Sequence, residues 1–150
     1  MSVEQNKAAV RRFFEKGWNQ KNLAAFSVLL APDSVHHIVS AAFPAGPPGP
    51  QGFMQRAAGI LAAFPDYHVT IEDDIAEGDR VVVRYTARGT HVGPFLGVPP
   101  TGRRFSYGGV EIHRYADGKV AEHWNSHDAL GFYQQLGIMP PLPQPDGQPR

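Results

Sequence analysis

The chain has 150 residues, with 14 basic side chains against 14 acidic ones, seven histidines and no cysteine. A chain of this length can bury a sizeable core in one domain, and zero net charge argues against the basic surface of a nucleic-acid or anionic-membrane binder. Without cysteine there is no disulfide, thiolate nucleophile or cysteine-type metal site. Any chemistry must therefore come from carboxylates, imidazoles, hydroxyls and amides.

The first residues are polar, and no apolar run approaches the roughly 18 residues of a membrane span. These features predict neither a signal peptide nor a transmembrane helix. We therefore expect a cytoplasmic protein with no membrane partner.

Two helices are predicted at the start of the chain. Ser2 and Gln5 form a capping box ahead of apolar residues at helical spacing, which predicts an amphipathic helix over residues 3–18. Asn22 can cap a second, shorter helix with a buried stripe that begins at Leu23.

A strand and a third helix follow. Pro32 and Asp33 are expected to turn the chain out of the second helix, and residues 35–40 form a plausible strand. The helical period returns over residues 53–64, where Pro65 ends the third helix at the residue before it.

The second half of the chain is predicted to form two β-hairpins and a last helix. The expected strands are 67–77, 80–90, 103–115 and 119–125. Turn residues at 78–79 and 117–118 connect the strands of each hairpin. A short helix over 128–136 ends at Gly137, a typical C-terminal stop.

Glycine and proline together make up 30 of the 150 residues, and most prolines fall in three segments. Residues 41–50 and 91–102 are expected to be surface loops, because clustered prolines are incompatible with a helix or a central strand. Residues 138–150 are expected to be a proline-rich tail, which leaves one domain over residues 1–137.

The order of these elements predicts an α+β fold rather than alternating βαβ units. Long antiparallel strands with helices at one end favour a strongly bent, mostly antiparallel sheet wrapped around the N-terminal helices. Such a cone-shaped α+β barrel encloses a cavity between sheet and helices, the default place for a small ligand.

Common catalytic motifs are missing from the sequence. It contains neither a glycine-rich nucleotide motif nor the nucleophile elbow of a serine hydrolase. His123 and His127 have the spacing of a helical zinc pair, but on a strand they would lie roughly 13 Å apart, too far to share an ion. We therefore expect no metal.

The last two strands carry the most chemically informative residues. Glu111 and His113 lie two apart and therefore share one face of their strand, where a buried carboxylate needs a partner. On the next strand the same alternation separates Glu122, Trp124 and Ser126 from His123, Asn125 and His127. Parity alone leaves open which of these two sets faces inward.

Asp128 has two interpretations. An aspartate at the start of a helix commonly caps it, and the same residue at the end of the last strand could act as a general acid or base. His36 and His37 point to opposite sides of a strand, so at most one of them can face a pocket.

The sequence resembles the SnoaL-like polyketide cyclases of the nuclear transport factor 2-like superfamily, which include ester cyclases. The resemblance covers nearly the whole domain and excludes the tail. Its motifs are Phe13-Phe14-Glu15, Trp18-Asn19-Gln20-Lys21-Asn22-Leu23, Leu30-Ala31-Pro32-Asp33, Ala63-Phe64-Pro65-Asp66, Glu77-Gly78-Asp79-Arg80, Gly89-Thr90-His91, Phe95-Leu96-Gly97-Val98-Pro99-Pro100-Thr101-Gly102, His123-Trp124-Asn125 and Gln135-Leu136-Gly137.

The resemblance implies a cone-shaped α+β barrel, often a homodimer, that closes a ring by a cofactor-free intramolecular aldol reaction. It implies a general acid/base at Asp128 and a pocket histidine at His113, with Glu111 as the polar partner. His37 lies where similar sequences carry a polar group on the first strand.

These residues suggest a small, apolar, carbonyl-containing substrate. Asp128 would deprotonate a carbon between two carbonyls, and His113 with a tyrosine such as Tyr107 or Tyr115 would stabilise the developing oxyanion. The remaining substrate-binding candidates are aromatic: Trp18, Phe64 and Trp124.

Other functions stay open on the same fold. An isomerase or an epoxide hydrolase would need the same buried acid. A non-catalytic ligand-binding or dimerisation module would use Asp128 only to cap its helix.

Overall fold

The computed structural model describes residues 1–39 and 47–143. Most of the loop expected at 41–50 and part of the expected tail therefore lie outside the described residues. The elements in chain order are α1 (Val3–Arg12), η1 (Phe13–Asn19), α2 (Leu23–Leu29), β1 (Leu30–Val39), α3 (Pro50–Ala63), β2 (His68–Glu77), β3 (Arg80–Thr90), β4 (Arg104–Ala116), β5 (Lys119–His127) and α4 (Ala129–Leu136).

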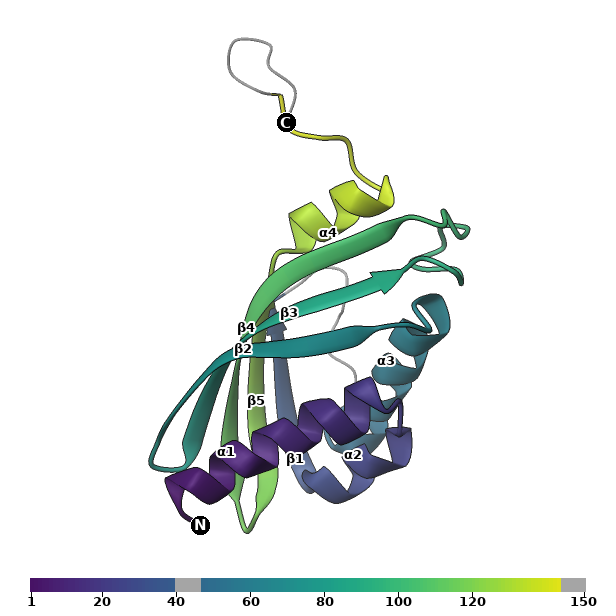
Figure 1. Ribbon diagram of the computed structural model, residues 1–150. Helices are drawn as coiled ribbons and strands as arrows, with labels where there is room; N and C mark the ends of the chain where they lie inside the picture. The colour runs from purple at the N-terminus through teal and green to yellow at the C-terminus, as the bar shows by residue number, and fades with distance from the viewer. Residues whose placement is uncertain (40–46, 144–150) are drawn as a thin grey trace.

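The five strands form one strongly curved sheet in the order β1-β5-β4-β3-β2. Only the β1–β5 pair is parallel, and the other pairs are antiparallel. The sheet bends around α1, α2 and α3, while α4 lies near the far ends of β3 and β4 (Figure 1). The predicted α+β class and the bent, mostly antiparallel sheet are confirmed, and the sheet does not close into a full barrel.

The predicted first helix is continuous but changes its winding. Ser2 and Gln5 make both hydrogen bonds of the capping box. From Phe13 onward the helix continues as the π-helix η1, which ends with the Gln20 N–H donating to the Glu15 carbonyl. This wider winding buries Phe13, Phe14, Gly17 and Trp18 against the sheet and α2.

The first strand begins earlier than predicted. Pro32 and Asp33 lie inside β1 instead of turning the chain out of a helix. The pairing of β1 with β5 shifts between Leu30 and Val35, so the proline occupies an irregular part of an edge strand, where it costs no ladder hydrogen bond. The other predicted elements are confirmed, with bounds that differ by at most three residues.

The apolar core fills the concave side of the sheet. Its largest fully buried side chains include Phe13, Phe26, Phe64 and Phe132. The aromatic rings of the core form two clusters. One contains Phe13, Phe26 and Phe53, and the other contains Phe64, Phe105 and Phe132.

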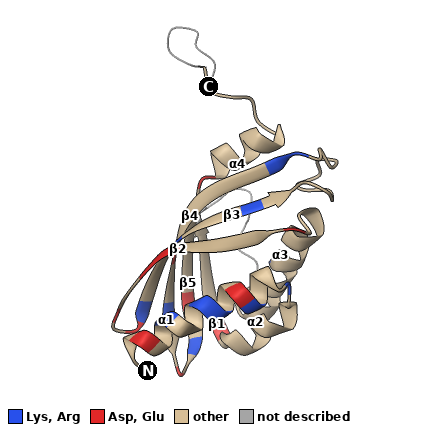
Figure 2. Cartoon of the chain, in the orientation of Figure 1, with Lys and Arg blue, Asp and Glu red and all other residues tan. Residues whose placement is uncertain are grey.

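Charged side chains of both signs occur on the same elements, α1 included (Figure 2). No helix within residues 1–39 and 47–143 is both long enough and apolar enough to cross a membrane. The mixed charge pattern agrees with the zero net charge of the chain.

Candidate active site

A partly enclosed cavity lies between η1, α3 and the concave face of the sheet. The cavity volume is about 30 Å³, within a space of about 450 Å³ between the lining atoms that includes open solvent. The apolar wall consists of Phe14, Trp18, Ile38, Phe53, Ile60 and Val69. The polar lining consists of Arg56, Tyr67, Tyr85, Tyr107, Glu111, Asn125 and His127. This mixture of an apolar wall with a few polar groups is typical of small-molecule sites.

The carboxylate that lines this cavity is Glu111, and two buried histidines hold it. His113 Nε2 lies 2.9 Å from Glu111 Oε2, and His123 Nε2 lies 3.2 Å from Glu111 Oε1. All three residues are at most 5% exposed, so their contacts are shielded from bulk water.

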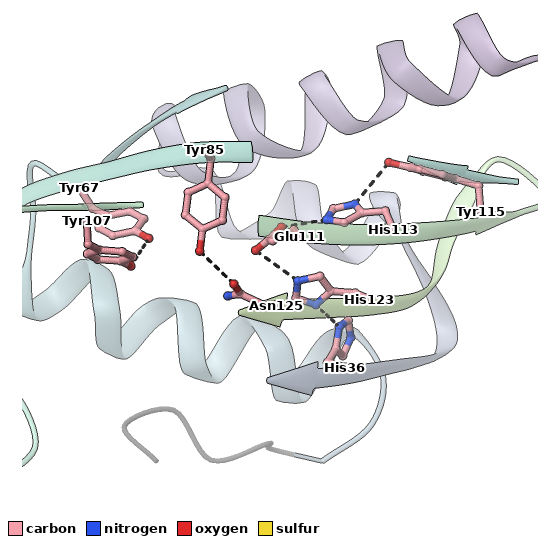
Figure 3. Close-up of polar contacts among 9 residues, drawn as sticks. All are labelled: His36, Tyr67, Tyr85, Tyr107, Glu111, His113, Tyr115, His123 and Asn125. Atoms are coloured by element: carbon pink, nitrogen blue, oxygen red, sulfur yellow. Dashed lines mark hydrogen bonds and ion pairs between the residues drawn. The ribbon is translucent and has the colours of Figure 1, made fainter. Parts of the chain in front are cut away.

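The contacts continue beyond this group in both directions (Figure 3). His36 Nδ1 lies 3.3 Å from His123 Nδ1, and His36 Nε2 lies 3.0 Å from the Ser34 hydroxyl. At the other end the Tyr115 hydroxyl lies 3.5 Å from His113 Nδ1. One arrangement of protons fits these contacts, with Ser34 and Tyr115 at the ends and each group directed towards Glu111. The 3.2 Å contact of His123 Nε2 with Glu111 is a close polar contact without hydrogen-bond geometry.

The pKa values follow from burial and from this arrangement. Burial alone would raise the pKa of Glu111, but His123 and His113 outweigh it and hold that pKa well below the usual range. Burial lowers the pKa of His113, although its hydrogen bond to Glu111 acts in the opposite direction. Burial, with His123 and Arg56 nearby, lowers the pKa of His36 to about 3. Glu111 is therefore an anion and a weak base.

A β-bulge puts the histidines of β5 on the inner face. Tyr115 pairs with Val120, but after a shift between Arg114 and Tyr115 the residue opposite His113 is His123. A regular two-residue hairpin would place Glu122 opposite His113 instead. Because side chains alternate along a strand, this one-residue shift turns the set His123, Asn125 and His127 towards the cavity.

Four polar side chains supply uncharged donors and acceptors at the cavity. The Tyr67 and Tyr107 hydroxyls lie 3.0 Å apart, and the Tyr85 hydroxyl donates to Asn125 Oδ1 at 2.9 Å. Burial raises the pKa of all three tyrosines, so they stay protonated at neutral pH. Within the Tyr67–Tyr107 pair only one hydroxyl donates to the other, so the second can donate a hydrogen bond to an oxygen that develops negative charge.

His127 was not singled out from the sequence as a site residue, yet it lines the cavity. Burial lowers the pKa of His127, whereas the charges of Glu111 and Asp128 act to raise it. A half-buried imidazole that is neutral at pH 7 is suited to accept a proton.

Asp128, the predicted general acid/base, lies outside the lining of this cavity. It is the N-cap of α4, and its Oδ1 accepts a hydrogen bond from the Gly131 N–H at 2.9 Å. Its side chain borders an open groove whose lining also includes Tyr85 and His127, two residues that line the cavity as well. The capping interpretation describes its contact, while its catalytic role stays a prediction.

Four of the other predicted site residues lie at the cavity or next to it. Glu111, Trp18 and Tyr107 line the cavity. His113 lies behind Glu111 and packs edge-on against Phe13, with ring centroids 4.7 Å apart.

Three predicted residues lie elsewhere. His37 and Trp124 stack on the outer face with ring centroids 5.3 Å apart, and His37 is 2.7 Å from Glu122. Phe64 lies in the core beside Phe132. Of the two adjacent histidines it is His36 that faces the interior.

Glu111, His113 and His123 also have side chains of the types that bind metal ions. Ligand atoms of Glu111, His113 and His123 all lie within 4.8 Å of one another. A carboxylate with two imidazoles is the donor set of several iron and zinc sites. Here, however, the 2.9 Å contact between Glu111 and His113 is a hydrogen-bond distance, and donation towards Glu111 accounts for the arrangement without an ion.

Comparison with known proteins identifies the family. The sequence pattern of the SnoaL-like polyketide cyclases matches residues 8–136. The chain belongs to this family. Among curated SnoaL-like relatives, the aklanonic acid methyl ester cyclase of Streptomyces peucetius is 37% identical over 100 residues, which span 66% of this chain and 68% of the relative. The nogalonic acid methyl ester cyclase of Streptomyces nogalater is also 37% identical over 100 residues, 66% of this chain and 73% of the relative.

Solved structures agree with the SnoaL-like assignment. A Streptomyces galilaeus protein provisionally described as a hydroxylase superposes with a TM-score of 0.81 at 34% identity, over 95% of this chain and 87% of that protein. TsrD of Streptomyces laurentii superposes with a TM-score of 0.81 at 31% identity, over 93% of this chain and 99% of that protein.

Proposed function

We propose that this SnoaL-like chain catalyses a cofactor-free, intramolecular aldol-type ring closure of a polyketide-like carbonyl substrate bound in the cavity. The observation that carries the proposal is the joint lining of one partly enclosed space by aromatic walls, a half-buried histidine and protonated tyrosines. The names of the curated relatives point to the same class of reaction.

The first step is removal of a proton from a carbon that lies between two carbonyl groups. His127 takes this proton on a ring nitrogen and becomes an imidazolium, while the electron pair of the C–H bond moves into the enolate. Glu111 is less suited to this step, because the histidines that hold it make it a weak base.

The second step forms the ring. The enolate carbon attacks a second carbonyl carbon of the same molecule, a C–C bond forms, and the carbonyl π electrons become an alkoxide. Hydrogen bonds from the tyrosines that line the cavity stabilise the enolate and the alkoxide. The alkoxide then takes the proton from the His127 imidazolium, so the product is an isomer of the substrate.

Asp128 acts through His127 in this proposal. Its negative charge raises the pKa of the neighbouring imidazole and makes it a better base. Asp128 is then a positioning residue rather than the group that touches the substrate. The expectation from the sequence, with Asp128 as the direct base, is the alternative that the experiment must distinguish.

The test uses aklanonic acid methyl ester and the corresponding free acid, with product mass as the first readout. Ring closure leaves the mass unchanged, whereas hydroxylation adds one oxygen. We expect His127→Gln to lower kcat/KM by about 10²- to 10⁴-fold. Asp128→Asn should keep most of the activity and move the acidic limb of the pH profile to lower pH, because loss of the negative charge lowers the pKa of His127.

The opposite pattern would assign the proton transfer to Asp128. In that case Asp128→Asn loses the activity and His127→Gln keeps it. Asparagine caps a helix about as well as aspartate, so thermal unfolding of Asp128→Asn should match the wild type. If neither compound is consumed, the binding-module interpretation gains support. A homodimer is also part of the proposal, and light scattering after size-exclusion chromatography measures it.

A further inference from the structure

Arg56 places a positive charge at the wall of the cavity opposite the sheet. It lies on α3, and its side chain lines the same space as Glu111, Tyr67 and His127. Arginine is rarely buried in a cavity unless something pairs with it.

The guanidinium has an aromatic neighbour but no counter-ion among residues 1–39 and 47–143. Its Cζ lies 4.7 Å from the centroid of the Phe53 ring, one helical turn earlier. None of the ion pairs formed within these residues involves Arg56. A flat guanidinium resting on a ring keeps its N–H edge available for a planar acceptor.

Burial lowers the pKa of Arg56 to about 10, although Glu111 and Tyr67 act to raise it. The group therefore stays charged at neutral pH. A charge that is partly removed from water and lacks a close counter-ion costs folding free energy. Groups of this kind are characteristic of binding sites, where a ligand supplies the missing partner.

Glu111 does not remove the need for such a partner. Its oxygens already face His113 at 2.9 Å and His123 at 3.2 Å, and the contacts of both imidazoles converge on it. These contacts leave the carboxylate negatively charged, and that charge acts to raise the pKa of Arg56, but no ion pair joins Glu111 to Arg56. The guanidinium on α3 therefore has no ion-pair partner within the described part of the chain.

We propose that Arg56 binds a free carboxylate of the substrate through its planar pair of N–H groups, and that this chain therefore prefers a carboxylic acid to the corresponding methyl ester. The inference rests on the proposed function only in taking this cavity as the substrate site. A carboxylate offers two charged acceptors to the guanidinium, whereas a methyl ester offers one weaker carbonyl acceptor.

The test measures binding without turnover. Isothermal titration calorimetry compares 2-naphthoate with methyl 2-naphthoate, a flat aromatic pair that differs only in the charged group. We expect the wild type to bind the acid about 10- to 100-fold more tightly than the ester. In Arg56→Gln this preference should fall to within about twofold, and Arg56→Lys should keep part of it because it retains the charge.

Arg88→Gln is the matched control, because Arg88 is an exposed arginine on β3 outside the cavity lining. It should keep the full preference for the acid. Thermal unfolding adds a second readout: a structural Arg56 predicts a lower midpoint for Arg56→Gln, whereas an anchor for a missing anion predicts an equal or higher midpoint.

Equal binding of acid and ester to the wild type, failure of the acid to bind, or an unchanged preference in Arg56→Gln would overturn the inference. A chain that binds the acid through Arg56 but converts neither aklanonic compound would support this inference while counting against the cyclase proposal.

Discussion

At the scale of single residues, Glu111 joins two histidines that would otherwise lack a buried acceptor. It is 5% exposed, and both of its oxygens face an imidazole. The hydrogen bond between His113 and this carboxylate is charge-assisted and therefore stronger than a neutral one. The buried carboxylate therefore links β4 to β5 at the site as well as lining the cavity.

We expect Glu111→Gln to lower the free energy of unfolding by about 1–3 kcal/mol, because glutamine keeps the shape but loses the charge that both histidines face. Urea denaturation measures the change. Glu122→Gln is the control: Glu122 contacts His37 and Arg114 on the partly exposed outer face, and its effect should be smaller. An equal loss of unfolding free energy in both variants would contradict a larger stabilising role for the buried Glu111 than for Glu122.

Contacts between side chains could be predicted from the sequence where the strand is regular. The pairing of Glu111 with His113 follows from spacing, and the structure contains it. The inward face of β5 did not follow, because the bulge beside Tyr115 reverses the alternation expected from a two-residue turn. The sequence left both faces of this strand open and offered Trp124 as an aromatic pocket residue, but Trp124 stacks on the outer face and His127 lines the cavity.

At the scale of elements, η1 brings the helix backbone close to α2. A side chain at Gly17 would overlap the ring of Phe26, which is itself fully buried. This close approach explains a glycine in the middle of a helix, where it otherwise costs stability.

Gly17→Ala should therefore lower the free energy of unfolding by about 1–3 kcal/mol through overpacking. Gly59→Ala is the matched comparison, since Gly59 lies on the exposed side of α3 with open space around its Cα. It should raise stability by roughly 0.5–1 kcal/mol through helix propensity alone. Thermal or urea unfolding of both variants tests the pair, and a stabilising Gly17→Ala would refute the packing argument.

The helices and strands themselves followed from apolar periodicity, caps and turn residues. The capping box at Ser2 and the stop at Gly137 mark element ends that the structure contains. The π-helical winding of η1 could not be predicted, because it results from packing against Phe26 and the sheet rather than from any local signal.

At the scale of the whole molecule, several buried imidazoles make stability depend on pH. The pKa of His36 is lowered to about 3 in the folded chain, against about 6.5 when unfolded. Between these values the unfolded chain binds a proton that the folded chain does not. Stability is therefore complete above about pH 6.5 and falls as the pH decreases. The lowered pKa of His113 acts in the same direction.

We expect the free energy of unfolding to decline from pH 7 to pH 4. The slope due to His36 is at most about 1.4 kcal/mol per pH unit, and less because the residue is partly exposed. His36→Gln removes the titrating group and should flatten this slope. Urea denaturation at four pH values measures it, and identical slopes for the variant and the wild type would exclude a contribution from His36.

The bulge lies where the pairing of β4 with β5 shifts between Arg114 and Tyr115, opposite Val120. It also bears on how the chemistry of such a cavity could change. Deleting one residue there would return β5 to regular alternation and turn Trp124 inward while His123 and Asn125 turned outward. No codon beyond the bulge would need to be substituted. A single in-frame deletion would thus exchange an imidazole-lined wall for an indole-lined one, a shorter genetic path than replacing the lining residue by residue.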